Sequence, residues 1–300
     1  MDRFVAMHVF VRVVETGTFS AVARERNTNQ SAISKQVAAL EQHLGAKLLT
    51  RSTRALALTD DGQRYFEQAR RLVGEVAEAE DQLRRGEGQL HGWLRVAAPA
   101  GFGLRELMPH VHRFLATHPD LKIDLKLDDR HIDLVDQGID IAVRIGNLSD
   151  SALIARCIGN SHGALMASQG YLKTISGQKS MPLNPTDLLQ HPCIVYTELS
   201  TKNVWRFSHA DGSDVAVAVA GPLQSNNSEA VRAALLDGIG IACAPTWMAK
   251  EALASGQVQR LMPEWQITPL PIHLVCPPHR KHAIKVRAFS DYLARAFAHD

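Results

Sequence analysis

The chain has 300 residues, of which 45% are hydrophobic and 21% charged, and its 33 Lys and Arg nearly balance 31 Asp and Glu. This composition is ordinary for a globular protein and excludes a disordered one, and the length allows roughly two or three folding units with cores of their own. The first residues are charged and no apolar stretch approaches about 18 residues, so we expect a cytoplasmic protein with neither a signal peptide nor a membrane span.

Two helices are predicted at the beginning of the chain. Residues 2–16 carry apolar residues at helical spacing and are followed by Gly17, which favours a helix end. Thr18 or Ser20 then caps a second short helix, FSAVARER. The apolar stripe that we expect the first helix to bury consists of Phe4, Met7, Val11 and Val14.

A third helix is predicted between Asn29, whose amide oxygen can accept from the first turn, and Gly45. At about 100° per residue, its apolar stripe consists of Ile33, Val37, Leu40 and Leu44. The opposite face is slender, polar and cationic and consists of Ser31, Ser34, Lys35, Ala38 and Gln42. Such a face is either simply solvated or fits a DNA major groove. Together with the preceding helix it makes a helix-turn-helix candidate.

The segment LLTRSTRALALT, residues 48–59, has an apolar start, a polar bend and an alternating end. This pattern predicts a two-stranded wing from which Arg51 and Arg54 project beside the groove. The alternative for both arginines is a solvated loop. Residues 1–60 contain eight Lys and Arg and five Asp and Glu, an excess of three that lies where phosphate neutralisation requires it.

A single long helix is predicted from the segment DDGQRYFEQARRLVGEVAEAEDQL, residues 60–83. Its narrow apolar stripe follows alternating three- and four-residue steps and favours a partner helix, with packing on the following domain as the alternative. The glycine-rich segment RRGEGQLHG then breaks the helix and forms a linker. The stripe consists of Phe66, Ala69, Val73, Val76, Glu80 and Leu83.

Strands and helices alternate from Trp93 onward, which is typical of a mostly parallel sheet with helices on its faces. The segments SHGALMASQGYL and QITPLPIHLV are predicted to carry the chain between two such α/β lobes, and HAIKVRAFSDYLARAFA to return as the last helix. Strands of the second lobe are expected near 193–196, 215–219 and 241–244.

The sequence gives little support for a catalytic or cofactor-binding motif. GFGLRE follows a strand like a dinucleotide fingerprint, but Glu106 stands at the third glycine position and no GxSxG, P-loop or HExxH occurs. His110 and His112 are two residues apart on a helix and point different ways, so no metal site is expected. The cysteines lie in apolar runs without a CxxC pair and are interpreted as small core residues, although spacing leaves a redox pair open. They are Cys157, Cys193, Cys243 and Cys276.

The N-terminal segments resemble the winged helix-turn-helix of LysR-type transcriptional regulators. The resemblance is carried by VVETGTFSAVARE, NQSAISKQVAALEQHLGAKLLTRSTR and LALTDDG, and it continues in order through LRVAAPAGFG, DLVDQGIDIAVRIGNLSDSALIAR and AALLDGIGIACAP. It implies a multidomain α plus α/β fold and a sequence-specific DNA-binding regulator, not an enzyme, that responds to a small-molecule effector. A solute-binding or enzymatic α/β protein with a structural helical domain is the alternative, but a simple solute-binding protein would lack residues 1–90.

The resemblance also implies domain bounds and partners. The partners are double-stranded DNA, a small-molecule effector, a second copy of the chain in a dimer that pairs further into a tetramer, and RNA polymerase. No cofactor is implied. The implied domains are a winged helix-turn-helix at 1–59, a linker and dimerisation helix with its hinge at 60–91, and a periplasmic-binding-protein-like effector domain at 92–300, with lobe I at 92–163 and 268–300 and lobe II at 164–267.

For DNA binding, the resemblance places four side chains on the bases and two on the backbone, namely Gln30, Ser31, Ser34 and Lys35, then Arg51 and Arg54. Two positions depart from the family pattern. Arg26 stands where an apolar residue is usual, and we expect its methylenes to cover the domain while its guanidinium reaches solvent or DNA. Thr28 replaces a second apolar residue, and a buried hydroxyl there would lower the stability of the domain.

Ligands of parallel α/β sheets gather beyond the carboxyl ends of strands, and this predicts the effector cleft. Four such ends, together with SNNSEA, which opens a helix nearby, give the predicted lining residues Ala100, Gly101, Phe102, Arg144, Thr197, Asn226 and Pro245. The family's hydroxyl residue near Ala100 is absent, which leaves backbone N–H groups to bind a carboxylate. Arg144 either faces the cleft, which favours an organic anion as effector, or pairs with Asp140 on the same strand face.

Overall fold

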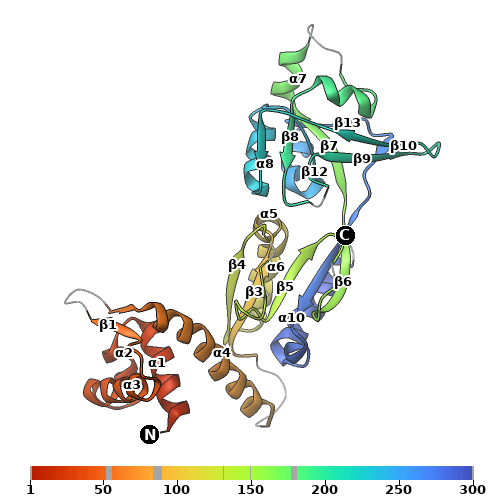
Figure 1. Cartoon of the computed structure of the whole chain (residues 1–300). Coiled ribbons are helices and arrows are strands. Elements are labelled where there is room, and N and C mark those ends of the chain that lie inside the picture. The colour runs from red at the N-terminus through yellow and green to blue at the C-terminus, as the bar shows by residue number, and fades with distance from the viewer. Residues whose placement is uncertain are drawn as a thin grey trace. The chain divides into compact units, whose positions relative to one another are not determined.

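The computed structural model describes residues 2–51, 56–83, 90–130, 132–148, 150–176, 181–199 and 201–298. The chain forms two compact units, Met1–Gly88 and Gln89–Asp300 (Figure 1). Among the described helices, none has the length and hydropathy that crossing a membrane requires.

The first unit is a helix-turn-helix followed by a small hairpin and a long helix. Its elements are α1 (Arg3–Thr16), α2 (Phe19–Glu25), α3 (Gln30–Leu44), β1 (Leu49–Arg51), β2 (Leu56–Leu58) and α4 (Asp60–Leu83). The Asn29 side chain accepts the Ala32 N–H at 2.8 Å and Gly45 ends α3 with a positive φ, so both predicted boundaries of this helix are confirmed. Thr18, not Ser20, caps α2.

The core of the first unit corrects two predicted stripes. In α1, Val11 is buried and Met7 and Val14 pack against the core as predicted, but Phe4 is exposed and the buried residues centre on Phe10, which faces α3 and α4. In α3 the residues Ile33, Val37 and Leu40 are buried as predicted, but Leu44 lies on the last turn and is 39% exposed.

The long helix α4 does contribute to the core of its own unit, contrary to expectation. Ala69 is buried there, and Phe66 and Val73 pack against the same cluster. Only from Val76, which is 38% exposed, does the predicted stripe leave this core. The side chains of Glu80 and Leu83 lie outside the described residues.

The second unit has two lobes, each built on a five-stranded sheet. Lobe I has the strand order β4-β3-β5-β15-β6, with α6 and α10 packed on one face. Its elements are β3 (Gly92–Ala98), α5 (Ala100–Phe102), the π-helix η1 (Gly103–Leu107), α6 (Met108–Thr117), β4 (Leu121–Leu127), β5 (Ile141–Ile145), β6 (Ile154–Ser161), β15 (Leu270–Cys276), η4 (Pro278–Arg280) and α10 (Ile284–Phe297).

Lobe II has the strand order β11-β8-β12-β7-β13, with α8 on one face and α7 on the other. Its elements are β7 (Gly163–Ser168), α7 (Gln169–Ile175), η2 (Pro185–Gln190), β8 (Cys193–Tyr196), β9 (Val204–His209), β10 (Asp214–Ala218), β11 (Leu223–Ser225), α8 (Ser228–Leu236), β12 (Ile241–Pro245), η3 (Thr246–Ala249), α9 (Lys250–Ala254), β13 (Val258–Leu261) and β14 (Trp265–Gln266).

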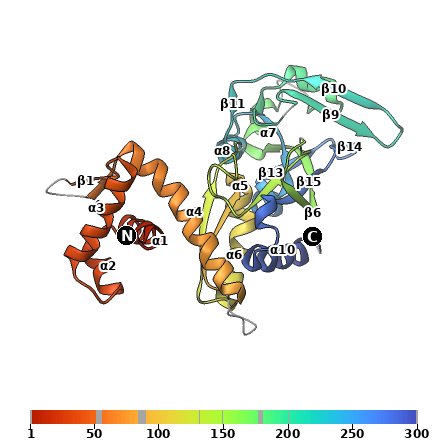
Figure 2. The ribbon, with the colours of Figure 1, turned by 60° about the horizontal axis from the view of Figure 1, so that its bottom comes forward.

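Both sheets are mixed rather than mostly parallel. In lobe I, β3 pairs in parallel with β4 and β5, but β15 runs antiparallel to β5 and β6. In lobe II, β7 runs antiparallel to β12 and β13. The antiparallel strands are those next to the two crossings between lobes, which explains why a simple βα rhythm did not predict them. The strand predicted near 215–219 belongs to a separate antiparallel sheet of order β10-β9-β14, which stands out from lobe II in Figure 2.

Candidate functional site

The outer face of α3 is polar and exposed. Gln30, Ser31 and Lys35 are exposed and Ser34 is half-buried, while the opposite face of the helix enters the core. The Ser20 hydroxyl at the start of α2 donates to the Gln30 side chain at 3.3 Å, which links the two helices of the motif. Four slender polar side chains therefore lie along one accessible helix face, as a groove-binding helix requires.

The wing is held in place by a buried carboxylate that the sequence reading missed. Glu41 on α3 accepts the backbone N–H groups of Leu48 and Leu49 at 2.9 and 3.2 Å and the Lys47 ammonium at 2.7 Å. Burial acts to raise the pKa of Glu41, but these hydrogen bonds outweigh it and hold the pKa below its ordinary value. The sequence signal for this contact was an acidic residue that directly follows Leu40 of the buried stripe.

Of the predicted wing arginines, the structure describes only the backbone of Arg51. Arg51 is the last residue of β1, where its backbone pairs with Leu56. The Arg51 side chain and the whole of Arg54 lie outside the described residues. Their contact with phosphate stays a prediction.

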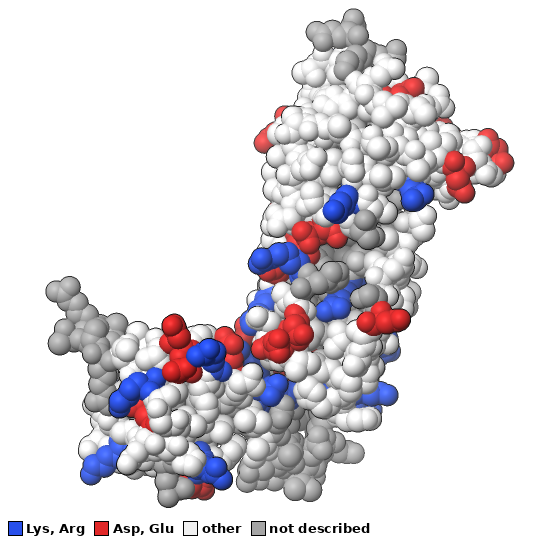
Figure 3. Space-filling view, viewed as in Figure 1, with Lys and Arg blue, Asp and Glu red and all other residues white. Residues whose placement is uncertain are grey.

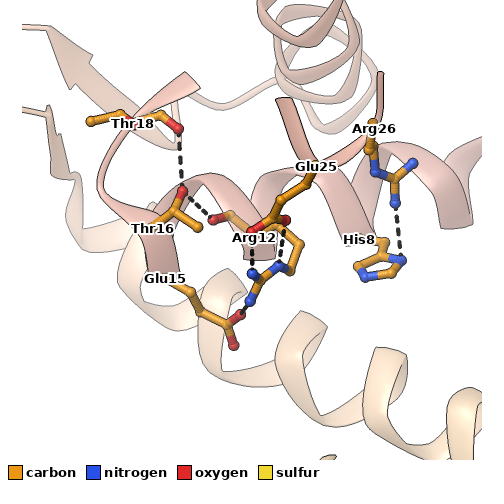
Figure 4. A network of polar contacts seen from close by, with 7 residues as sticks. All are labelled: His8, Arg12, Glu15, Thr16, Thr18, Glu25 and Arg26. Carbon is orange, nitrogen blue, oxygen red and sulfur yellow. Dashed lines mark hydrogen bonds and ion pairs between the residues drawn. The ribbon is translucent and has the colours of Figure 1, made fainter. Parts of the chain in front are cut away.

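Thr28 differs from expectation, and Arg26 makes a contact that was not predicted. Arg26 is half-buried, and its guanidinium lies 3.1 Å from Nδ1 of His8 on α1 (Figure 4). Because a guanidinium only donates, His8 accepts through Nδ1 and is neutral in this contact. Thr28 is exposed, so no hydroxyl is buried there, and its N–H donates to Ala23 at 2.9 Å. Thr28 therefore gives no reason to expect a less stable domain.

Protonation of His8 is expected to weaken the first unit at acidic pH. Burial, then the charges of Arg26 and Arg12, lower the pKa of His8 below its ordinary 6.5, while Glu15 and Glu25 act in the opposite direction. The unfolded chain then binds more protons than the folded one, so stability is complete above about pH 6.5 and declines below it. In urea titrations of the full-length protein, His8→Asn should lose less stability than wild type between about pH 6.5 and about pH 5. Parallel pH curves for the two proteins would contradict this role of His8.

A cavity of about 140 Å³ lies between the lobes of the second unit. Its apolar wall includes Ile132, Leu134, Val143, Trp247 and Met248, and its charged lining consists of Lys126, Asp128, Asp129, Arg130, Arg144 and Glu198. On the face shown in Figure 3, side chains of both charge signs gather where the lobes meet, and little of lobe II beyond that junction is charged. A small molecule with an apolar body and a charged group fits such a cavity.

Two of the predicted effector residues, Arg144 and Pro245, line this cavity. Arg144 does not pair with Asp140. Its Nη2 donates to the Ile132 carbonyl at 3.2 Å, whereas Asp140 accepts the Arg95 N–H and lies 3.2 Å from Nε of Arg280. Burial lowers the pKa of Arg144, partly offset by Asp133. Arg144 is thus a half-buried cation on the cavity wall, bonded to a neutral group.

The other five predicted effector residues are not among the lining residues described in the second unit. The reasons are local. Phe102 is buried, with its ring 5.6 Å from those of both Trp247 and Phe297. Thr197 follows the end of β8, and the cavity is lined there by its neighbours Tyr196 and Glu198 instead. Asn226 is exposed.

At the first strand end, the expected backbone donors are already bound. The Ala100 N–H donates to Asp129 at 2.8 Å and the Gly101 N–H to the Ser228 hydroxyl at 3.1 Å. Neither amide points free into the cavity. Neither Asp129 nor Ser228 was predicted from the sequence as part of this site.

The cysteines are mostly core residues. Cys193 and Cys276 are buried and Cys243 lines the cavity, whereas Cys157 is exposed on the outward side of β6, contrary to expectation. Burial raises the pKa of Cys193 and of Cys243 to about 12 each, so both are protonated thiols near neutral pH. These two thiols are therefore poor nucleophiles.

Comparison with known proteins extends over nearly the whole chain. A family model described as a bacterial regulatory helix-turn-helix protein of the lysR family matches residues 4–63, and one described as a LysR substrate binding domain matches residues 87–298. The chain is 33% identical to the HTH-type transcriptional regulator DmlR of Escherichia coli, over 97% of this chain and 94% of that protein. It is 34% identical to the HTH-type transcriptional regulator PtxR of Pseudomonas aeruginosa, over 96% and 90%.

Solved structures agree with these relatives. The structure of CrgA, a LysR-type transcriptional regulator from Neisseria meningitidis, is matched with a TM-score of 0.63 at 30% identity, over 97% of this chain and 98% of that one. The full-length structure of the Vibrio cholerae virulence activator AphB is matched with a TM-score of 0.62 at 27% identity, with the same coverage. The similarity therefore includes both units of the chain.

Proposed function

The chain belongs to the family of LysR-type transcriptional regulators, which join a DNA-binding helix-turn-helix to a domain for a small-molecule effector, and from this premise we propose how its own residues perform both tasks. We take residues 1–59 as the DNA-binding domain, 60–91 as the linker helix and hinge, and 92–300 as the effector domain. The protein acts in the cytoplasm, because bacterial DNA lies there.

In this proposal α3 enters the major groove. Gln30, Ser31, Ser34 and Lys35 meet base edges and neighbouring phosphates, and Arg51 and Arg54 of the wing contact the backbone beside them. The exposed polar face of α3 supports this assignment, since its side chains are short enough to allow close approach.

Dimerisation through α4 supplies a second copy of α3, which reads the second half-site of the DNA. Leu72 and Val76 are four residues apart on α4, and they are 41% and 38% exposed. Such a pair forms one apolar face, which a second copy of the helix would cover. A dimer then reads two half-sites, and further pairing into a tetramer and contact with RNA polymerase complete the proposed set of partners.

The effector is a small organic anion bound against Arg144. Among the cations that line the cavity in the described part of the chain, Arg130 pairs with Asp128 at 3.0 Å and Lys126 donates to the Gln137 amide at 3.2 Å. Within the described residues, Arg144 is bonded only to a backbone carbonyl, and a guanidinium held in an apolar wall gains most from an anionic partner. This observation carries the assignment of the effector's chemical class.

A calorimetric screen of aromatic and aliphatic carboxylates tests the assignment. For an acid that binds the wild type, Arg144→Gln should weaken the affinity by about 10- to 100-fold, because a charge-assisted hydrogen bond is lost. Asn226→Ala is the matched control, since Asn226 lies outside the cavity lining, and its affinity should be unchanged. An acid that binds Arg144→Gln as tightly as wild type would sink the assignment.

A further inference from the structure

One wall of the cavity is closed by a carboxylate that belongs to the chain itself. Asp129 follows β4 in lobe I, and its Oδ1 accepts the Ala100 N–H at 2.8 Å. Its Oδ2 accepts both the N–H and the hydroxyl of Ser228, the first residue of α8 in lobe II, at 2.7 and 2.9 Å. The Ser228 oxygen in turn accepts the Gly101 N–H at 3.1 Å. One side chain of lobe I is thus bonded to both lobes.

The donors that Asp129 fills are of the kind that bind anions. The Ala100 and Ser228 amides lie at the starts of helices, where backbone N–H groups have no partner within the helix. The lobes approach closely here, since a Cβ at position 101 would lie 2.8 Å from the Ser228 hydroxyl oxygen. A larger side chain at position 101 would therefore have to displace the Ser228 hydroxyl from its present contacts.

An ion pair supports the same junction. Arg105 in η1 of lobe I donates to Glu229 in the first turn of α8, with Nε–Oε1 and Nη2–Oε2 distances of 3.1 and 2.8 Å. The forked geometry of the guanidinium fixes the orientation as well as the distance. Figures 1 and 2 both show α5, which leads into η1, beside α8. The two lobes are thus tied at adjacent points along this edge of the cavity.

We propose that Asp129 is a built-in occupant of the cavity's strand-end carboxylate site, which holds the lobes together without an effector and leaves Arg144 to bind the effector's acid group. The second half of this statement rests on the function proposed above, and the first half does not. An effector acid that used the strand-end donors would have to displace Asp129. The residue therefore determines both closure of the lobes and the position of the ligand's charge.

Amide hydrogen exchange in the full-length protein tests the occupancy of the donors. Asp129→Ala should accelerate exchange about tenfold or more in peptides that contain the Ala100 and Ser228 amides, because both lose a charged acceptor. Formate, which restores the missing carboxylate, should slow this exchange again, whereas equal chloride should not. Asp128→Ala is the matched control, since its carboxylate bonds to Arg130 in its own loop, and exchange at these amides should stay as in wild type.

Two results would overturn the proposal. One is unchanged exchange in Asp129→Ala, and the other is faster exchange that formate does not slow, which would indicate general loosening of the domain. If Asp129→Ala does not fold, Asp129→Asn is measured in the same way, because its amide has one acceptor oxygen in place of two. None of these arms involves an effector, so failure of the Arg144 assignment would leave them intact and would be seen separately.

Discussion

Asp140→Ala is expected to destabilise the second unit by about 3 to 5 kcal/mol, because it leaves the charge of Arg280 buried without its carboxylate. The two side chains are 3% and 4% exposed, with the Oδ1–Nε distance at 3.2 Å. Asp140 also accepts the Arg95 N–H at 2.8 Å, so the change leaves this buried N–H without its acceptor as well.

Urea unfolding followed by tryptophan fluorescence measures this loss in the full-length protein. All of the tryptophans lie in the second unit, so their emission reports that unit alone, and they are Trp93, Trp205, Trp247 and Trp265. Asp136→Ala removes an exposed carboxylate nearby and should change stability by about 0.5 kcal/mol or less. Equal midpoints for Asp140→Ala and Asp136→Ala would show that the buried pair does not hold the lobe.

Glu41→Ala is expected to destabilise the first unit by about 2 to 4 kcal/mol, because the backbone N–H groups of Leu48 and Leu49 would stay buried without an acceptor. Because those residues lead into β1, the wing should lose its fixed position and DNA affinity should fall as well. The loss should appear in circular dichroism as a helical transition at lower urea than the tryptophan transition.

Glu41→Gln is the control for this second effect. It retains a neutral acceptor for the two amides but loses the ion pair with Lys47, whose ammonium is largely exposed and contributes little. We therefore expect a loss of stability between that of wild type and that of Glu41→Ala. A helical transition in Glu41→Ala that coincides with that of wild type would disprove the structural role of this carboxylate.

Local signals in the sequence predicted local structure well. Asn29 and Gly45 delimit α3 because an N-cap side chain and a glycine with positive φ each act within one helical turn. The strands near 193–196 and 241–244 are found where they were predicted, because the residue pattern of a short strand is also a local signal. The centre of the α1 packing face and the exposure of Leu44 were missed, since they depend on which helices cover the stripe.

The effector cavity shows the limit of such reading. Strand-end logic predicted Arg144 and Pro245 as lining, yet Ala100 and Gly101 have their amides bound by groups that are 29 and 127 positions away in sequence. Nothing in the local pattern around residue 100 reveals that Asp129 and Ser228 reach it. Long-range hydrogen bonds of this kind follow from how the two lobes meet, which sequence periodicity does not specify.

Footprinting on genomic DNA tests the assignment of α3 as the reading helix most directly. The wild-type protein and the triple variant Ser31→Ala, Ser34→Ala, Lys35→Ala are compared at equal concentration and salt, with circular dichroism as a check on folding. We predict that the wild type protects sites with two half-sites and that the folded triple variant loses this protection, because its base and phosphate contacts are removed. Protection of the same sites at the same concentration by the triple variant would contradict the account.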